Sequence, residues 1–306
     1  MAKWKTAFCA TMPVAALIVV PMLTSTALAA GSTAIPDFSG FWARTSLGFE
    51  SPASGRGPVK NRNLRPNGSS NFSNLAGDYT DPLLKPEAAE VLKRLAAMSV
   101  RNEAFPQPSN QCLPYPPPYI SSMNQAVELL QEKNRVTILT MFDHQVRTVR
   151  LNAKHPAKVT PSWYGDSVGH YEGDTLVVDT IGIKTGPYPM VDIYGTPFSP
   201  ALHVVERFRL IDNQAALDAN ARSERENQRV GGENGDGVDI DRDYKGPGLQ
   251  LTITVEDAGM FNEPWTGNVT YFRGADDWAE SVCAENVREY YAGKDTAIPV
   301  TKRPDF

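Results

Sequence analysis

A histidine and several acidic residues lie within residues 165–180, at spacings that could support acid–base chemistry. The Gly173–Asp174 pair lies between β-branched and aromatic residues and predicts a hairpin with a two-residue turn, because Gly tolerates the positive φ of such turns. The predicted cross-strand pairs are Glu172 with Thr175, His170 with Val177, and Val168 with Asp179. His170 and Asp179 are then diagonal neighbours on one face, roughly 7 Å apart at Cβ. They are either an acid–base dyad or groups that cap the turn and satisfy one another at the surface.

Glu206 is a third candidate for acid–base chemistry, within the strand expected at residues 202–211. The alternation of that strand places Glu206 on the same face as Val204 and Phe208. A carboxylate on such a face needs a partner, or desolvation favours its neutral form, which is how enzymes produce a general acid or base. The alternative for Glu206 is an ion pair with an inward Arg, or hydrogen bonds from Trp or Tyr. The predicted catalytic residues are Glu206, His170 and Asp179.

Aromatic residues in loops and at strand ends predict contacts with a flat or apolar ligand at a barrel mouth, and ordinary core packing is an equal alternative. These aromatic residues are Trp163, Tyr164, Tyr188, Tyr194 and Trp265. On the polar face of the 202–211 strand, His203 and Arg207 form either a solvated surface or part of an anion clamp. The predicted ligand-binding residues are Trp163, Tyr171, His203, Arg207 and Trp265. His144 and His155 occur in turn-like contexts and are expected at the surface.

Eight stretches rich in β-branched and aromatic residues, separated by turn residues, predict strands. They are residues 125–131, 135–141, 145–151, 167–172, 175–183, 202–211, 249–256 and 268–273. Because few helices intervene, we predict a mainly β fold, with an antiparallel sheet closed into a barrel or packed as a sandwich. Helical spacing and helix-start or helix-end residues predict a few short peripheral helices. They are expected at residues 86–98, 214–228 and 277–291.

The chain from residue 30 to residue 306 is expected to form one β-rich domain, because it contains no internal repeat and its length suits one large all-β domain. Residues 44–120 lose apolar periodicity and predict a long arm of loops, one helix and a proline-rich segment. Residues 212–248 predict a polar insert between strands. Both segments are expected to lie outside the sheet.

The N-terminus predicts export. Lys3 and Lys5 precede an apolar stretch, and residues 27–29 read Ala-Leu-Ala, so residues 1–29 are expected to be a signal peptide. Removing it changes the net charge from −5 to −7. A mildly acidic chain does not favour nucleic acid as a partner, and no segment predicts stable membrane insertion. We expect a periplasmic or secreted protein of undetermined oligomeric state.

Two cysteines remain after residue 29, Cys112 and Cys283. An even number in an oxidising compartment favours one disulfide between them, and the alternatives are two buried free thiols or a catalytic thiol. No spacing of Cys and His predicts zinc, so no metal is expected. The acidic loop at residues 231–243 suggests calcium but does not fit the EF-hand pattern. No nucleotide-binding or hydrolase motif is present, and no cofactor is predicted.

Five segments carry a family resemblance. They are residues 36–42, 81–88, 112–114, 167–180 and 203–208. Together they resemble an exported family of hypothetical bacterial proteins whose characteristic run is SIGxWEGDTLVVDT, followed by HxxERF and a late cysteine. His170 stands where that family often has Arg or Lys, so the resemblance favours Glu206, Asp174 and Asp179 over His170. The Gly40-Phe41-Trp42 run also resembles the GxW of lipocalin-like barrels, which implies a tryptophan that closes one barrel end.

Two functions of different classes are compatible with these patterns. The first is an exported barrel that binds a small, largely apolar or aromatic molecule, as the alternating strands and loop aromatics indicate. The second is a cofactor-independent lyase, isomerase or hydrolase that uses carboxylate and histidine groups. The second function requires Glu206 to share a cavity with His170 or Asp179, whereas side chains on opposite faces of the sheet would exclude that arrangement.

Overall fold

The computed structural model describes residues 1, 35–101, 103–227, 240–275 and 282–283, and all of these except Met1 belong to one compact unit within residues 33–306. Apart from Met1, the expected signal peptide at residues 1–29 lies outside the described residues. The same is true of the acidic loop up to residue 239 and of the expected C-terminal helix apart from residues 282 and 283.

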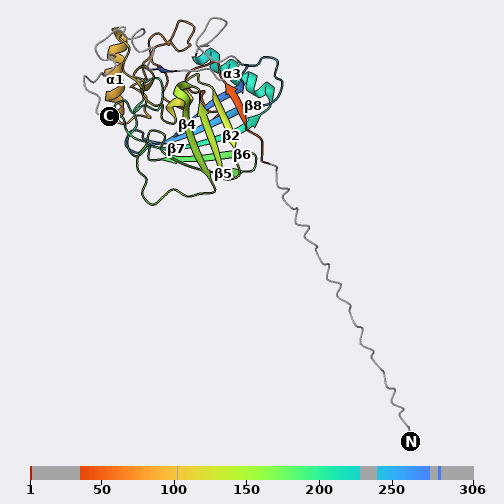
Figure 1. Cartoon of the computed structure of the whole chain (residues 1–306). Helices are drawn as coiled ribbons and strands as arrows, with labels where there is room; N and C mark the ends of the chain where they lie inside the picture. Colours follow the sequence, from red (N-terminus) through yellow and green to blue (C-terminus); the bar gives the residue numbers. More distant parts are fainter. Residues whose placement is uncertain (2–34, 102, 228–239, 276–281, 284–306) are drawn as a thin grey trace, which may run out of the picture. The chain divides into compact units, whose positions relative to one another are not determined.

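Nine strands form a closed barrel in which each strand pairs with the next along the chain and β9 pairs back with β1 (Figure 1). The strands are β1 (Gly40–Ala43), β2 (Val127–Gln131), β3 (Arg135–Thr140), β4 (Gln145–Leu151), β5 (Asp166–Glu172), β6 (Thr175–Ile181), β7 (His203–Ile211), β8 (Gly248–Glu256) and β9 (Trp265–Arg273). The predicted mainly β fold is therefore confirmed, and of the two arrangements expected it is the barrel that forms.

The hairpin of β5 and β6 has the register that the sequence predicts. Glu172 pairs with Thr175, His170 with Val177, and Val168 with Asp179. The two-residue turn is possible because Gly173 has a φ of +62°. Because successive side chains alternate between faces, this register decides which residues of the hairpin point into the barrel.

The expectation of a fully antiparallel sheet is wrong at one place, because β4 and β5 are parallel. They share only the pairs Val149 with Ser167, Arg150 with Val168 and Leu151 with Gly169. The first half of β4, residues 145–148, therefore pairs with β3 alone among the described strands. A parallel neighbour requires the chain to return along the barrel before β5 begins, and the loop at residues 152–165 makes that return without a helix.

The barrel interior is filled by the inward side chains of alternating strand positions. In β8 these are Leu249, Leu251, Ile253 and Val255, all buried. Trp42 of β1 is also buried, and its Nε1 donates to the Phe38 carbonyl at 2.8 Å. The Arg273 guanidinium lies 4.0 Å from the centre of the Trp42 ring, a cation–π contact. The first and last strands are thus joined by packing as well as by backbone pairing.

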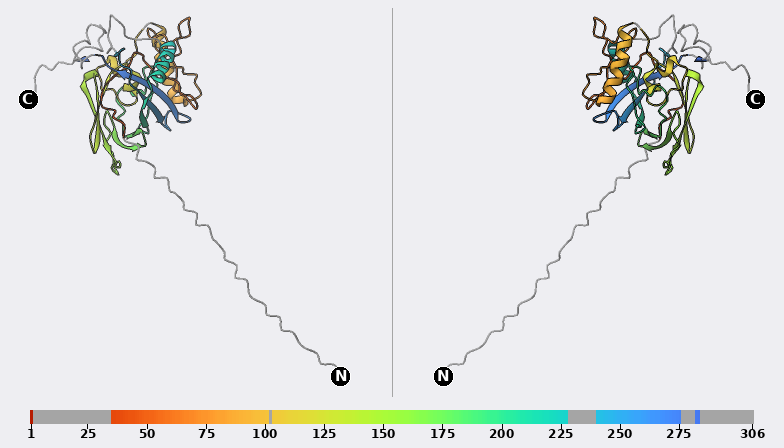
Figure 2. Two further views of the ribbon diagram at one scale, coloured as in Figure 1. Left: turned by 90° about the vertical axis from the view of Figure 1, so that its right-hand side faces the viewer. Right: turned by 90° about the vertical axis from the view of Figure 1, so that its left-hand side faces the viewer.

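The two longer helices lie on one side of the barrel (Figure 2). The described helices are α1 (Pro86–Val100), α2 (Tyr119–Ser122) and α3 (Asn213–Asn227), with 3-10 turns η1 (Pro108–Asn110) and η2 (Phe142–His144). The helices predicted near residues 86–98 and 214–228 are therefore present. Helix α3 contacts β8 and β9, and its residues Ala216 and Ala219 are buried. Small side chains let the helix approach the sheet closely, as the tight fit of Ala216 against Gly248 shows.

Cys112 and Cys283 form the predicted disulfide, with their Cα atoms 5.4 Å apart. The bridge joins the proline-rich segment to a residue that follows β9, across 171 positions of sequence. Such a bond is consistent with an oxidising compartment. Among the described residues, no helix is long and apolar enough to cross a membrane.

Candidate functional site

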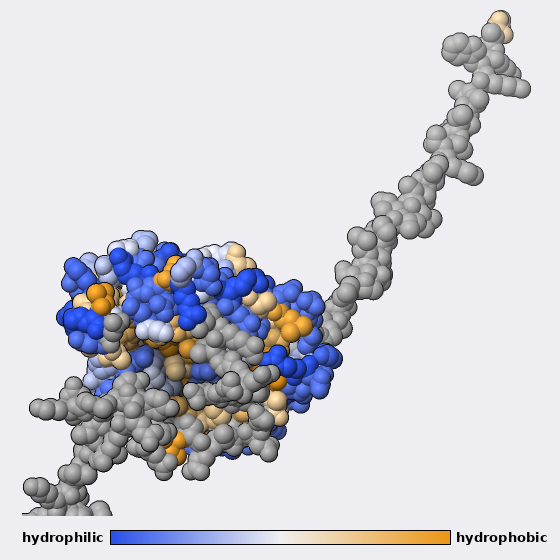
Figure 3. All heavy atoms as spheres, turned by 90° about the horizontal axis from the view of Figure 1, so that it is seen from above, coloured by the Kyte–Doolittle hydropathy of each residue, from blue (hydrophilic) through white to orange (hydrophobic). Residues whose placement is uncertain are grey.

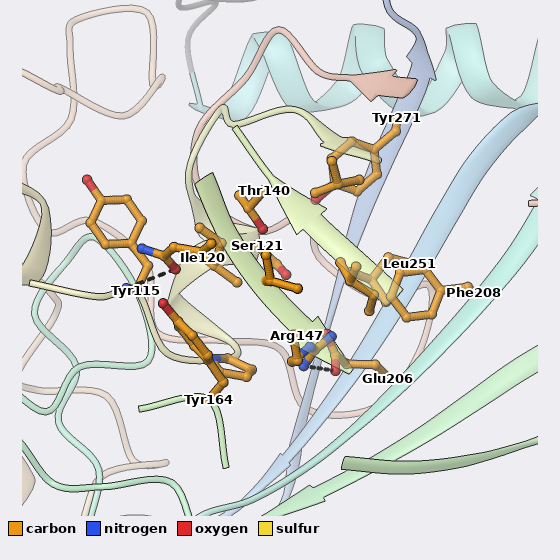
Figure 4. Close-up of a pocket in the computed structure, with 15 residues that line it drawn as sticks. Tyr115, Ile120, Ser121, Thr140, Arg147, Tyr164, Glu206, Phe208, Leu251 and Tyr271 are labelled. Atoms are coloured by element: carbon orange, nitrogen blue, oxygen red, sulfur yellow. Dashed lines mark hydrogen bonds and ion pairs between the residues drawn. The ribbon is translucent and has the colours of Figure 1, made fainter. Parts of the chain in front are cut away.

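A pocket opens into the barrel beside the first half of β4 (Figure 4). It is lined by Tyr115, Pro117, Ile120, Ser121, Val127, Ile138, Thr140, Gln145, Val146, Arg147, Tyr164, Glu206, Phe208, Leu251 and Tyr271. Its contributors include β4, which lacks a β5 partner at this height, and Tyr164 from the loop that returns to β5. The parallel, offset pairing of β4 and β5 thus positions the pocket.

The pocket is narrow. The cavity itself measures about 30 Å³, and about 460 Å³ of atom-free space lies between the walls when the mouth is included. A cavity of 30 Å³ holds little more than a water molecule. A ligand as large as one aromatic ring must therefore occupy the mouth as well as the cavity.

Arg147 and Glu206 form an ion pair in the pocket wall. Arg147 Nη1 donates to Glu206 Oε2 at 2.6 Å, and Nη2 donates to Oε1 at 2.9 Å. The Glu206 side chain is 1% exposed and that of Arg147 is 11% exposed. Both residues face inward, from β4 and β7, so the pair crosses the barrel interior. Its bidentate geometry satisfies both carboxylate oxygens and cancels the two buried charges.

The remaining walls are mainly aromatic and aliphatic. In the view of Figure 4, Tyr115, Ile120 and Tyr164 lie on one side, and Phe208 and Leu251 lie on the other. The Arg147–Glu206 pair lies below Phe208 and Leu251 in the same view. Apolar walls around a few polar groups are typical of small-molecule sites.

Tyr271 lines the pocket and is shielded from solvent, with 2% of its surface exposed. Burial raises the pKa of Tyr271 to about 12, and a hydrogen bond with Ser121 opposes that shift only in part. The phenol therefore stays neutral and can act as a hydrogen-bond donor or acceptor at physiological pH.

Gln145 is the first residue of β4 and is 8% exposed. Its Oε1 accepts a hydrogen bond from the Tyr115 backbone N–H at 3.3 Å. Its Nε2 is buried and has no hydrogen-bond partner among the described residues. Across the β3–β4 pair it faces Thr140, which also lines the pocket.

The three predicted catalytic residues do not share a cavity, which corrects their grouping. Glu206 pairs in register with Val178 and points inward, whereas Asp179, the next residue of β6, points outward. His170 is exposed on the outer face and contacts Glu172 at 2.9 Å. Glu206 has the ion pair with an inward Arg that was the alternative to a catalytic role.

Asp179 belongs instead to a network on the outer face, here called the outer network. It consists of Arg150, Asp166, His155, Asp179, His203 and Glu256. His155 Nδ1 lies 2.6 Å from Asp166 and its Nε2 lies 2.9 Å from Asp179. His203 Nε2 lies 3.2 Å from the other oxygen of Asp179. Because His155 comes from the β4–β5 loop, the network fastens that loop to the barrel.

None of the five predicted ligand-binding residues lines the pocket. Trp163, beside Tyr164 in the sequence, packs under Lys184, whose Nζ lies 5.1 Å from the ring centre. Trp265 is buried in the core against Phe49. The other three also have partners elsewhere. Tyr171 accepts from Gln131 at 2.9 Å, His203 contacts Asp179 at 3.2 Å and Arg207 contacts Glu172 at 2.7 Å.

Sequence reasoning missed Gln145 and Arg147. The signal for both was present, because alternation in residues 145–151 places them on the same face as Val149 and Leu151. An arginine on the apolar face of one strand and a glutamate on the apolar face of another can be expected to form an ion pair, because each buried charge needs an opposite charge.

Within the described residues, no group of three or more His, Cys, Asp or Glu side chains is arranged to hold a metal ion. Comparisons with family models, with curated proteins and with solved structures found no match to this chain.

Proposed function

We propose that this protein binds a small, largely apolar or aromatic molecule in the barrel pocket, as a periplasmic or secreted binding protein. The observation that carries the proposal is a pocket with aliphatic and aromatic walls. Of the described residues that line it, only Arg147 and Glu206 are charged, and they neutralise each other. Apolar ligands gain about 25 cal/mol for each Å² removed from water. The neutralised pair lets the ligand be buried without facing an unpaired charge.

Export is the second part of the proposal. It is supported by the signal-like sequence of residues 1–29 and by the disulfide between Cys112 and Cys283. The surface is compatible with a protein that acts in water, because the exposed large hydrophobic side chains among the described residues are scattered. The face seen from above in Figure 3 is mainly hydrophilic where it is coloured.

Acid–base catalysis is not proposed, because the arrangement that it required is missing. Glu206 is bound by Arg147 inside the barrel, and His170 and Asp179 lie outside it. No single cavity thus offers the substrate two of the three predicted catalytic groups.

Two adjacent aromatic residues give a matched test. Tyr164 lines the pocket, whereas Trp163 packs against Lys184 outside it. Tyr164→Ala should weaken binding of a small aromatic probe such as acetophenone about tenfold, because it removes one aromatic wall. Trp163→Ala should leave the affinity within about twofold. Isothermal titration calorimetry measures both, and a larger loss in Trp163→Ala would move the binding site away from the pocket.

The natural ligand can be sought directly. Native mass spectrometry of protein purified from its own host should show an added mass that is lost on denaturation, and that mass identifies the compound class. If the ligand in this complex is hydrophilic and carries several charges, the proposed function is wrong.

A further inference from the structure

Gln145 presents a hydrogen-bond donor for which the described protein supplies no acceptor. The amide orientation is fixed, because the Tyr115 backbone N–H can bond only to the oxygen of the Gln145 side chain. The opposite atom, Nε2, is then the donor, and it is buried without a partner. A buried donor left unpaired is costly, so such a group points to an acceptor that completes it.

The residues around Gln145 indicate which kind of ligand could carry the acceptor. Thr140 is its cross-strand partner and lines the same pocket, so a hydroxyl lies beside the amide. The neighbouring walls include Tyr115 and Ile120. The polar corner is therefore small and is bordered by apolar surface.

The charge of the molecule is limited by the ion pair. Among the described residues that line the pocket, only Arg147 and Glu206 are charged, and they bind each other through two hydrogen bonds. A charged ligand would lose its water without gaining a counter-ion, unless it broke this pair.

We propose that the ligand is a neutral aromatic or apolar molecule with one hydrogen-bond acceptor, a carbonyl oxygen, an ether oxygen or a ring nitrogen, that Gln145 Nε2 binds. This inference rests on the proposed function and narrows it from apolar molecules in general to those with an acceptor at one end. Gln145 is then the residue that orients the ligand and selects it over hydrocarbons of the same shape.

Three probes of similar shape test the inference with the unmodified protein. Acetophenone carries the acceptor, ethylbenzene lacks it and benzoate carries a full charge. Acetophenone should bind about tenfold more tightly than ethylbenzene, because ethylbenzene leaves the buried donor unpaired. Benzoate should bind more weakly than acetophenone. Calorimetry at neutral pH gives the three affinities.

The outcomes separate the inference from the proposed function. Equal affinities for acetophenone and ethylbenzene, or tightest binding of benzoate, overturn the inference but leave an apolar binding pocket in place. Failure of all three probes to bind at millimolar concentration overturns both. A preference for acetophenone supports both.

A variant connects the preference to Gln145. Gln145→Met is close to glutamine in size and carries no hydrogen-bond donor and no group that can be protonated into one, so the preference for acetophenone over ethylbenzene should disappear. Gln250→Met makes the same chemical change in β8, at a residue that does not line the pocket, and should keep the preference. An unchanged preference in Gln145→Met means that another residue donates to the ligand, which overturns the role of Gln145. If that variant does not fold, the three-probe comparison decides the matter alone.

Discussion

Two groups of charged residues lie on opposite faces of the barrel wall and differ in their exposure to solvent and in the number of their partners. Inside the barrel, Arg147 and Glu206 form one bidentate pair that is nearly sealed from water. Outside it, the outer network connects two histidines to three acids and an arginine, and the Asp179 side chain is 41% exposed. Glu206 and Asp179 come from neighbouring strands, one register step apart.

The difference shows that the face of the strand on which a carboxylate lies decides its exposure to solvent and its partners. Glu206 faces inward opposite Val178, whereas Asp179, the next residue after Val178, faces outward. The inner carboxylate has a single cationic partner and little solvent, so removing that partner leaves a buried charge. The outer carboxylates are more exposed than Glu206 and have several partners, so salt screens their interactions more strongly. Chemistry that needs a dry pocket is therefore confined to the inner face, and the outer network is suited to holding the β4–β5 loop.

The largest expected effect comes from breaking the inner pair. Glu206→Gln keeps the size of the side chain but leaves Arg147 buried without a counter-charge, which should lower the free energy of unfolding by about 3 kcal/mol. Urea unfolding followed by circular dichroism measures the change. The double variant Arg147→Met with Glu206→Leu removes both charges and should recover most of the loss. A loss under about 0.5 kcal/mol in the single variant would mean that the inner pair is solvated like the outer one.

Asp192 offers a second test of the comparison, because it is buried and no cationic side chain of the described residues pairs with it. Burial raises the pKa of Asp192 to about 6, although the backbone N–H groups of Tyr194 and Thr196 donate to its Oδ1 at 2.9 and 3.1 Å. Its contribution to stability is therefore present below the ordinary pKa of 3.8 and is lost as pH rises through about 6.

The Asp192 contribution should be on the order of 2 kcal/mol. Asp192→Asn keeps the Oδ1 acceptor and cannot ionise, so it should be more stable than the unmodified protein at pH 7.5 and show no such gain at pH 4. Urea unfolding at the two pH values tests this, and an equal effect of the substitution at both would contradict a raised pKa.

The smallest effect is expected in the outer network. Burial lowers the pKa of His155, but hydrogen bonds to Asp166 and Asp179 outweigh it, so the pKa lies above its ordinary value of 6.5. The stability that His155 contributes is therefore complete below pH 6.5 and is lost as pH rises through the folded pKa. Because the His155 side chain is 20% exposed and that of Asp179 is 41% exposed, solvent weakens these contacts, and His155→Ala should cost less than about 1 kcal/mol at pH 5.5 and less again at pH 8.5.

Salt distinguishes the outer network from the inner pair. Raising the ionic strength should reduce the cost of His155→Ala, because salt screens exposed charges. The same change should leave the cost of Glu206→Gln nearly constant. A cost of Glu206→Gln that falls with salt as steeply as that of His155→Ala would remove the distinction between the two faces. Unfolding titrations at 0.05 and 1 M NaCl provide the comparison.

Local sequence patterns predicted strands at the positions of β2 to β9 and the direction of their side chains, but they did not predict β1 (Gly40–Ala43). Alternation placed Glu206 inward, and the Gly173 turn set the register of β5 with β6, because both features depend only on neighbouring residues. The helices near α1 and α3 were predicted for the same reason. The disulfide followed from the even count of cysteines after residue 29, in a chain that is expected to be exported.

The partners of the site residues could not be predicted in the same way. Arg147 and Glu206 are 59 positions apart and meet only because the barrel closes, which brings the inward faces of β4 and β7 together. The parallel start of β5 has no signal in the loop at residues 152–165, which lacks a helical pattern. That loop also decides that Tyr164, rather than Trp163, faces the pocket, because side-chain direction in a loop has no fixed period.

The most direct test of the central claim, that the barrel pocket is the binding site, is a methyl NMR titration with acetophenone. The methyl groups of Leu251 and Ile138, which line the pocket, should show the largest shifts and should saturate together. Leu249 and Ile253 are buried in the same strand as Leu251 but do not line the pocket, and they should shift far less. Largest shifts at Leu249 and Ile253, or on the outer face of the barrel, would contradict binding in the pocket.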